Sequence, residues 1–319
     1  MPEEIVRLPL DPDLERLLVL AAAVEQPGIS TMTPAEARRW ANDSSPPPSS
    51  RRDLASVRPL TVTGGAGPIP ARLYDPAPGE TLPMLIHFHG GGWVLGTLDQ
   101  ADDTCRRLAT ETRSKVISVD YRLAPEHPYP APCDDAIAAT RDILARASEL
   151  GGRPDRIGVS GDSAGGHLAA VAAIALREAT DLPPLICQFL IYPVTDCDFT
   201  RPSMITNASG RLLETADMEW FWNHFCSDPT QRSEWKASPI RVADPAGLPP
   251  AIIALAAHDP LYSEGIAYAR RLEDAGVTTT VRTARDLIHG YYGLTQASAR
   301  ADQEVSIINT LIRDILHST

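Results

Sequence analysis

Ser163 is the residue of this chain whose setting is best suited to chemistry. It stands in the segment Gly-Asp-Ser-Ala-Gly at 161–165, between an apolar run at 156–160 and an alanine-rich run at 168–175. This order predicts a strand, a tight turn and a helix, with the serine at the turn. Glycines are expected on both sides because such a turn forces unusual backbone angles and leaves no room for side chains. The pattern therefore indicates that Ser163 is a nucleophile.

A run of three glycines lies upstream, in His-Gly-Gly-Gly at 89–92, directly after the apolar run 84–88. Glycines at the end of a strand expose bare N–H groups, which stabilise the oxyanion that forms during acyl transfer. A flexible turn is the alternative, but here a strand ends and its helix has not begun. We expect the N–H groups of Gly90, Gly91 and Ala164 to form an oxyanion hole. Together, the two motifs indicate hydrolysis of an acyl bond.

Hydrolysis by a serine also requires a base and an acid that orients the base. After a serine at a strand–turn–helix motif, the acid follows first in the chain and the histidine second. His289 lies just past the β-type run 278–283 and is the only histidine in that place. It is therefore the expected base.

Asp259 is the expected acid, because it follows the apolar run 251–257. Sites of parallel sheets lie at the carboxyl ends of the strands, which favours this position. Asp286 would share a loop with the base, and Glu264 belongs to the next helix, so both are weaker candidates.

These residues require a scaffold that brings the ends of several strands together. Two β-type runs, 60–63 and 69–74, flank a glycine-rich turn and predict an antiparallel hairpin. Alternation of strands and helices beyond it predicts an α/β fold, with a mostly parallel sheet and helices on both faces. The expected strands lie at 84–88, 116–120, 157–160, 185–191, 251–257 and 278–283, and the helices at 101–112, 132–150, 164–179, 264–275 and 303–316.

Two segments fall outside this alternation. The N-terminal segment carries helical patterns at 11–23 and after the capping residue Thr33, followed by a proline- and serine-rich linker at 44–50. The second segment is a connection of roughly 60 residues between the strands at 185–191 and 251–257, far longer than an ordinary connection.

The long connection holds Trp220, Trp222 and Trp235, and Thr215 can cap a helix there. Ordinary helix packing would explain some of these aromatic residues, but an aromatic-rich helical insertion over an α/β core favours a cap. The chain is therefore divided into a catalytic core, 52–196 and 237–319, and a helical cap, 1–51 and 197–236.

Composition narrows the expected partners. The chain has 319 residues and a net charge of −12, from 29 basic and 41 acidic residues, with no lysine or arginine block. We therefore expect no nucleic acid or membrane partner. The chain start lacks a signal-peptide core, and no apolar stretch approaches the ~20 residues that span a bilayer. Scattered cysteines without a CxxC pair are typical of reduced thiols, which predicts a cytoplasmic protein. They are Cys105, Cys133, Cys187, Cys197 and Cys226.

Five ordered motifs resemble those of the hormone-sensitive-lipase-like bacterial esterases, also called family IV carboxylesterases. The resemblance extends from residue 60 to the C-terminus. It implies an α/β-hydrolase fold with an eight-stranded sheet and a helical cap, activity on short acyl esters, and no metal or cofactor. The Gly-Asp-Ser-Ala-Gly form resembles the larger subgroup, which implies a homodimer joined through the edge of the last strand. The motifs are His-Gly-Gly-Gly-Trp at 89–93, Tyr-Arg-Leu-Ala-Pro-Glu-His-Pro-Tyr-Pro-Ala at 121–131, Gly-Asp-Ser-Ala-Gly-Gly at 161–166, Asp-Pro-Leu at 259–261 and His-Gly at 289–290.

Two positions depart from the pattern of that family. His167 stands where the family usually has asparagine, and Tyr262 and Ser263 stand where it usually has Arg-Asp. We expect His167 to be a partly buried polar residue bonded to a loop. Tyr262 and Ser263 lie beside the acid, where they could change the substrate preference. Neither departure removes a catalytic group.

Taken together, the residues predict a serine carboxylesterase that hydrolyses short- to medium-chain acyl esters through an acyl-enzyme intermediate. Its expected partner is a small-molecule ester. An arylamide amidase or deacetylase using the same triad stays open, as does a non-catalytic small-ligand receptor on a hydrolase fold. A lipase is disfavoured because the predicted cap mixes aromatic with charged residues. The expected pocket residues are Trp93, Asp162, Tyr192, Trp222 and Ile288, of which Asp162 is expected mainly to support the turn at Ser163.

Overall fold

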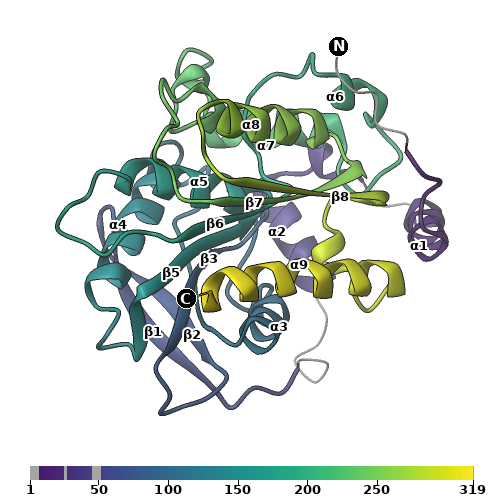
Figure 1. Ribbon diagram of the computed structural model, residues 1–319. Coiled ribbons are helices and arrows are strands. Elements are labelled where there is room, and N and C mark those ends of the chain that lie inside the picture. Colours follow the sequence, from purple (N-terminus) through teal and green to yellow (C-terminus); the bar gives the residue numbers. More distant parts are fainter. Residues whose placement is uncertain (1–6, 25–26, 45–51, 319) are drawn as a thin grey trace.

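The structure is a computed structural model that describes residues 7–24, 27–44 and 52–318. The start of the chain and nearly all of the predicted linker at 44–50 lie outside the described residues. Within the described part, an eight-stranded sheet forms the centre of the molecule, in the order β1-β2-β4-β3-β5-β6-β7-β8 (Figure 1). The strands are β1 (Ser56–Gly64), β2 (Gly67–Asp75), β3 (Leu82–Phe88), β4 (Lys115–Val119), β5 (Gly152–Asp162), β6 (Cys187–Ile191), β7 (Ala251–His258) and β8 (Thr279–Ile288).

The sheet is antiparallel at one edge and parallel elsewhere. β1 and β2 form the predicted hairpin, in which Val62 lies opposite Ile69, and β2 pairs with β4 in the antiparallel direction. The pairings from β4 to β8 across the rest of the sheet are parallel. Strands β3, β4, β6 and β7 are buried along their whole length because both faces are covered. The predicted fold class is confirmed.

Helices cover both faces of the sheet. Figure 1 shows α3 and α9 on one face and α4, α5 and α8 on the other. Helix α5 is apolar and buried over almost its whole length, because it packs between the sheet, α4 and the segment at 239–241. The bounds are α3 (Asp102–Thr112), α4 (Ala131–Ala145), α5 (Ala164–Leu176), α8 (Tyr262–Asp274) and α9 (Ala299–His317).

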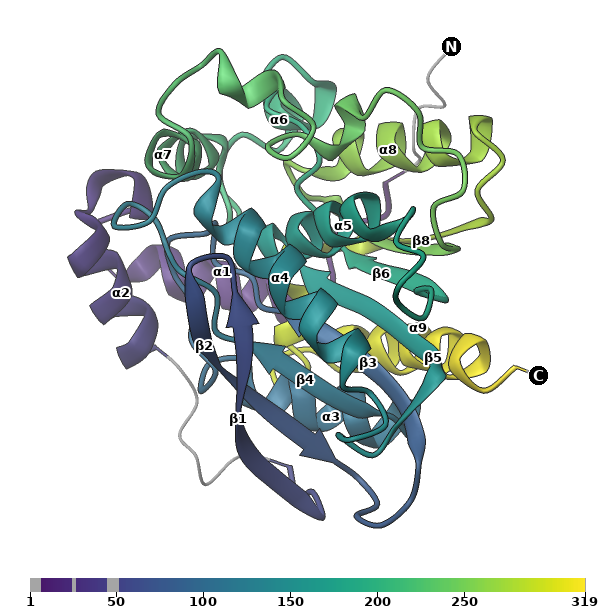
Figure 2. The same ribbon diagram turned by 90° about the vertical axis from the view of Figure 1, so that its left-hand side faces the viewer.

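The N-terminal arm and the insertion lie side by side over one end of the sheet (Figure 2). The backbone N–H of Ser30 donates to Asp217 Oδ1 at 3.0 Å, and Trp220 Nε1 donates to the carbonyl of Met32 at 3.1 Å. The arm consists of α1 (Pro12–Ala23), η1 (Ile29–Thr31) and α2 (Pro34–Asp43); the insertion contains α6 (Pro202–Thr206), α7 (Thr215–Phe225), η3 (Gln231–Ser233) and η4 (Pro239–Arg241).

The helix starts of these two segments agree only in part with the sequence analysis. Thr33 caps α2, in a capping box with Glu36. Thr215, in contrast, does not cap α7, because Glu214 takes that position. The hydroxyl of Thr215 donates instead to the carbonyl of Met204 at 2.6 Å, which ties α7 to α6.

Candidate active site

Ser163 lies at the turn between β5 and α5 with φ of +55° and ψ of −120°. This is a strained backbone for a residue with a side chain. A Cβ atom on Gly161 would lie 2.2 Å from the carbonyl oxygen of Gly165, and one on Gly165 would lie 1.9 Å from that of Phe88. Both flanking positions therefore require glycine, as the sequence predicted.

Ser163, His289 and Asp259 form a continuous chain of hydrogen bonds. Ser163 Oγ lies 3.1 Å from His289 Nε2, and His289 Nδ1 lies 2.7 Å from Asp259 Oδ2. A hydroxyl that donates to an imidazole, whose other N–H donates to a carboxylate, is the arrangement that activates a serine. The three residues follow β5, β7 and β8, whose carboxyl ends lie at the same edge of the sheet.

The two weaker acid candidates face other groups. Asp286 accepts a hydrogen bond from Arg300 Nε at 2.9 Å. Glu264 is fully buried, and its Oε1 accepts from the backbone N–H of Thr195 at 2.7 Å. The geometry therefore favours Asp259 as the group that orients the histidine.

The glycine loop, residues 90–93, turns the chain sharply after β3. Gly91, Gly92 and Trp93 have φ of +112°, +58° and +60°. The N–H of Gly90 donates to Asp162 Oδ1 at 3.0 Å. Here the prediction for Gly90 is corrected: its amide is bonded to a carboxylate and is not free to bind an oxyanion. Within residues 7–24, 27–44 and 52–318, the N–H groups of Gly91 and Gly92 have no hydrogen-bond acceptor.

Asp162 joins the glycine loop to the turn at Ser163. A Cβ atom on Gly90 would lie 2.3 Å from Asp162 Oδ2, so the loop packs directly on the carboxylate. Burial raises the pKa of Asp162 to about 6, and the N–H of Gly90 and the charge of His289 lower it in part. Asp162 thus supports the loop as well as the turn.

A cleft of about 360 Å³ opens beside the triad. Its walls include Asp162 and Gly290, the chain neighbours of Ser163 and His289. Tyr192 also lines the cleft, and its ring centre lies 4.5 Å from that of His289. The volume is near the lower end for sites that bind small molecules.

Three of the predicted pocket residues lie elsewhere. Trp93 and Trp222 are fully buried, and their ring centres are 5.1 Å apart. Trp93 also stacks on Phe225 at 4.1 Å, so its ring belongs to the packing between the insertion and α5. Ile288 is buried at the end of β8. The prediction is corrected for these three, whereas Asp162 and Tyr192 do line the cleft.

Sequence reasoning missed two contributions to the site. Trp40 and Ala41 of α2 line the cleft, so the arm forms part of its wall. Asn207 of the insertion donates from Nδ2 to the backbone carbonyl of Asp259 at 2.9 Å. The sequence assigned both segments to a cap, but no periodicity indicates which of their residues face the core.

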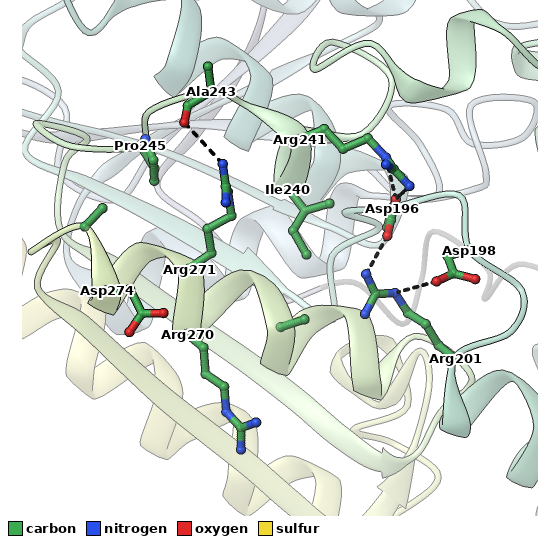
Figure 3. A pocket seen from close by; sticks show the side chains of 12 residues that line it. Asp196, Asp198, Arg201, Ile240, Arg241, Ala243, Pro245, Arg270, Arg271 and Asp274 are labelled. Carbon is green, nitrogen blue, oxygen red and sulfur yellow. Dashed lines mark hydrogen bonds and ion pairs between the residues drawn. The ribbon is translucent and has the colours of Figure 1, made fainter. Parts of the chain in front are cut away.

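A second hollow, of about 700 Å³, lies away from the triad, between α8 and the segments around Asp196 and Arg241. Figure 3 shows that several of its charged side chains pair with one another: Arg201 and Arg241 both bind Asp196. Arg271 donates to the carbonyl of Ala243 at 3.3 Å. None of the described residues that line the hollow is a serine, cysteine or histidine, so it is not the candidate active site.

The helices and the polar side chains of residues 7–24, 27–44 and 52–318 bear on two other kinds of site. None of the helices there combines the length and the apolar character that crossing a bilayer requires. No group of three or more His, Cys, Asp and Glu side chains in this part of the chain is placed to hold a metal ion.

Known proteins share this architecture. Residues 85–293 match a family model described as an alpha/beta hydrolase fold, and the chain belongs to that family. It is similar to Esterase LipI of Mycobacterium tuberculosis, with 40% identity over 81% of this chain and 82% of that protein. Ethyl acetate hydrolase of Pseudomonas putida is 35% identical over 94% of this chain and 97% of its own. Among solved structures, a thermostable esterase from Pseudomonas putida superposes with a TM-score of 0.92 at 32% identity, covering 98% of this chain and 99% of that one.

Proposed function

We propose that this protein is a serine carboxylesterase of the hormone-sensitive-lipase-like type, which hydrolyses short- to medium-chain acyl esters. The observation that carries the proposal is the chain of hydrogen bonds from Ser163 through His289 to Asp259. Relatives whose names describe esterases, one of them acting on ethyl acetate, support the same reaction. The Gly-Asp-Ser-Ala-Gly form of the motif at 161–165 supports the proposal that the protein belongs to the larger subgroup of the family, and a homodimer is the proposed assembly.

In the first half of the reaction, Ser163 Oγ attacks the ester carbonyl while its proton passes to His289 Nε2. Asp259 holds the proton on His289 Nδ1, which fixes the tautomer and stabilises the imidazolium. His289 then protonates the leaving alcohol, and Ser163 keeps the acyl group. In the second half, His289 takes a proton from the water that attacks the acyl-enzyme, and it passes this proton to Ser163 Oγ as the bond to the acyl group breaks and the acid leaves.

The oxyanion is proposed to bind at the backbone rather than at a side chain. Ala164 is the first residue of α5, so its N–H has no acceptor one turn earlier in the helix. The N–H groups of Gly91 and Gly92 are the other proposed donors, because Gly90 already donates to Asp162. One such donor is worth about 3–4 kcal/mol of barrier.

The arm and the insertion are proposed to act together as a cap over the cleft. They bind one another through Ser30 and Asp217 and through Met32 and Trp220. Trp40 of the arm reaches the cleft wall. This arrangement supports the division into a core and a cap.

Hydrolysis of p-nitrophenyl esters from acetate to palmitate tests the proposal. Wild type should turn over the short chains, and Ser163→Ala should abolish that turnover while the melting temperature changes little. Ser160→Ala is the matched control, because Ser160 is a buried residue of β5, the strand that precedes Ser163, and its hydroxyl bonds to His87 at 3.0 Å and not to His289. Turnover that survives in Ser163→Ala, or a folded wild type that cleaves arylamides but no ester, would overturn the proposal.

A further inference from the structure

His167 occupies an unusual position, one turn into α5 behind the nucleophile. It is fully buried. Its Nδ1 accepts a hydrogen bond from Trp93 Nε1 at 3.1 Å, and its Nε2 lies 2.9 Å from the backbone carbonyl of Lys236. The ring therefore connects three parts of the chain: the nucleophile helix, the glycine loop that Trp93 ends, and the last part of the insertion.

Both hydrogen bonds of His167 require the same neutral tautomer. The ring must accept at Nδ1, because Trp93 Nε1 can only donate, and it must donate at Nε2, because the Lys236 carbonyl can only accept. Burial lowers the pKa of His167 to about 4, so the ring is neutral at pH 7.

Trp93 needs such support because its backbone is unfavourable. It is the third successive residue with a positive φ, after Gly91 and Gly92, and the one of the three that has a side chain. Such a conformation persists where surrounding contacts enforce it. The contacts here include the hydrogen bond to His167, the stacking on Phe225 at 4.1 Å and the hydrogen bond that the Trp93 carbonyl accepts from the N–H of Ala124 at 2.9 Å.

The other end of the connection is fixed as well. The carbonyl of Lys236 also accepts from Cys133 Sγ at 3.3 Å, and Lys236 Nζ donates to Asp134 at 3.1 Å. The insertion is thereby attached to α4 at the point where His167 binds it. His167 consequently rests on a fixed carbonyl and holds a strained loop.

We propose that His167 is a positioning residue for the reaction: it holds Trp93 and thereby sets the N–H groups of Gly91 and Gly92 for the oxyanion. The inference rests on the proposed ester hydrolysis. Its consequence is that loss of the His167–Trp93 hydrogen bond weakens stabilisation of the transition state more than it weakens substrate binding.

His167→Leu, Trp93→Phe and the double variant test this with a short-chain p-nitrophenyl ester. Each single variant should lower kcat by about ten- to hundredfold, with KM within about threefold of wild type, since small displacements of catalytic groups have effects of this size. The double variant should lose no more than the worse single one, because both remove the same hydrogen bond. A trifluoromethyl ketone, which forms an oxyanion at the active serine, should bind more weakly by the factor lost in kcat/KM.

His167→Asn is the conservative variant, because its side-chain oxygen can take the place of Nδ1 while nothing reaches Lys236. It should recover most of the kcat lost in His167→Leu. Val171→Ala is the control for general destabilisation, since Val171 is buried one turn further along the same helix. The proposal fails if Val171→Ala lowers kcat as much as His167→Leu does, or if the losses multiply in the double variant. Wild-type turnover that depends on Ser163 is measured first, so failure of the proposed function is recognised separately.

Discussion

Glu264→Gln should remove a loss of stability that the wild-type protein undergoes as the pH rises from 5 to 7.5. Glu264 is fully buried in α8, and its Oε1 accepts from the N–H groups of Thr195 at 2.7 Å and Asp196 at 3.3 Å. In the part of the chain that the structure describes, its Oε2 has no hydrogen-bond partner. Burial raises the pKa of Glu264 from 4.5 to about 8, and the hydrogen bond from Thr195 offsets only part of that rise.

The sign of the effect follows from where the proton is held. The native state keeps a proton on Glu264 up to about pH 8, whereas the unfolded chain releases it near pH 4.5. The free energy of unfolding therefore falls as the pH rises between these values, by about 1.4 kcal/mol per pH unit. Between pH 5 and 7.5, ionisation of Glu264 in the unfolded chain lowers the free energy of unfolding by about 3 kcal/mol. In Glu264→Gln the oxygen still accepts and no proton titrates, so this decrease disappears.

Urea unfolding of wild type and variant at pH 5 and 7.5 measures the difference. Glu304→Gln is the control for a lowered pKa: burial raises the pKa of Glu304, but hydrogen bonds from Arg282 and Arg300 outweigh burial and lower it below 4.5. The stability that this carboxylate contributes is present above its unfolded pKa and is lost only below that value, so the difference between wild type and Glu304→Gln should be nearly the same at pH 5 and 7.5. A raised pKa of Glu264 is contradicted if the free energies of unfolding of wild type and Glu264→Gln differ by the same amount at both pH values, within about 0.5 kcal/mol.

Three further changes probe the site itself, each followed by steady-state kinetics on a short-chain ester. Gly91→Ala should lower kcat at least about 100-fold, because the shifted glycine loop loses an oxyanion donor. The new Cβ atom would lie 2.4 Å from the carbonyl oxygen of Leu95, at a residue with φ of +112°. Unchanged kcat would exclude Gly91 as a donor. Asp259→Asn should lower kcat by roughly three to four orders of magnitude, because an amide next to His289 favours the wrong tautomer; a loss below about tenfold would contradict that role. Arg38→Met should lower kcat several-fold at nearly constant KM. Arg38 Nε donates to the carbonyl of Val94, directly after the glycine loop, so loss of this hydrogen bond should loosen the loop. A rise in KM alone would indicate that the arm acts in substrate binding instead.

The triad was predictable because local chain geometry fixes each of its members. Ser163 lies between two glycines at which a side chain would meet backbone oxygen. β8 ends at Ile288, several residues beyond the predicted strand, and this brings His289 to the strand end itself. Asp259 likewise follows the last residue of β7. At these three positions the local backbone, a tight turn or a strand end, both produces the sequence pattern and places the catalytic side chain.

The pocket was less predictable because it depends on contacts between distant segments. An aromatic residue after a glycine run can line a cleft or fill a core, and Trp93 fills the core because Phe225 of the insertion stacks on it. The glycine run likewise does not indicate which of its N–H groups is already hydrogen-bonded within the protein. In the structure, the N–H of Gly90 donates to Asp162 of β5. Trp40 reaches the cleft only through the docking of the arm.

The two halves of the site depend on different parts of the chain. Strand ends carry the triad, whereas the glycine loop is held from outside the sheet: Arg38 of the arm binds the carbonyl of Val94 at 2.9 Å, and Phe225 of the insertion packs on Trp93. Loosening either segment should therefore weaken oxyanion binding while the Ser163–His289 hydrogen bond persists. Because substrate is still bound and the serine is still activated, such changes should lower kcat more than they raise KM. On this argument the arm and the insertion belong to the catalytic unit, although neither contributes a residue to the triad.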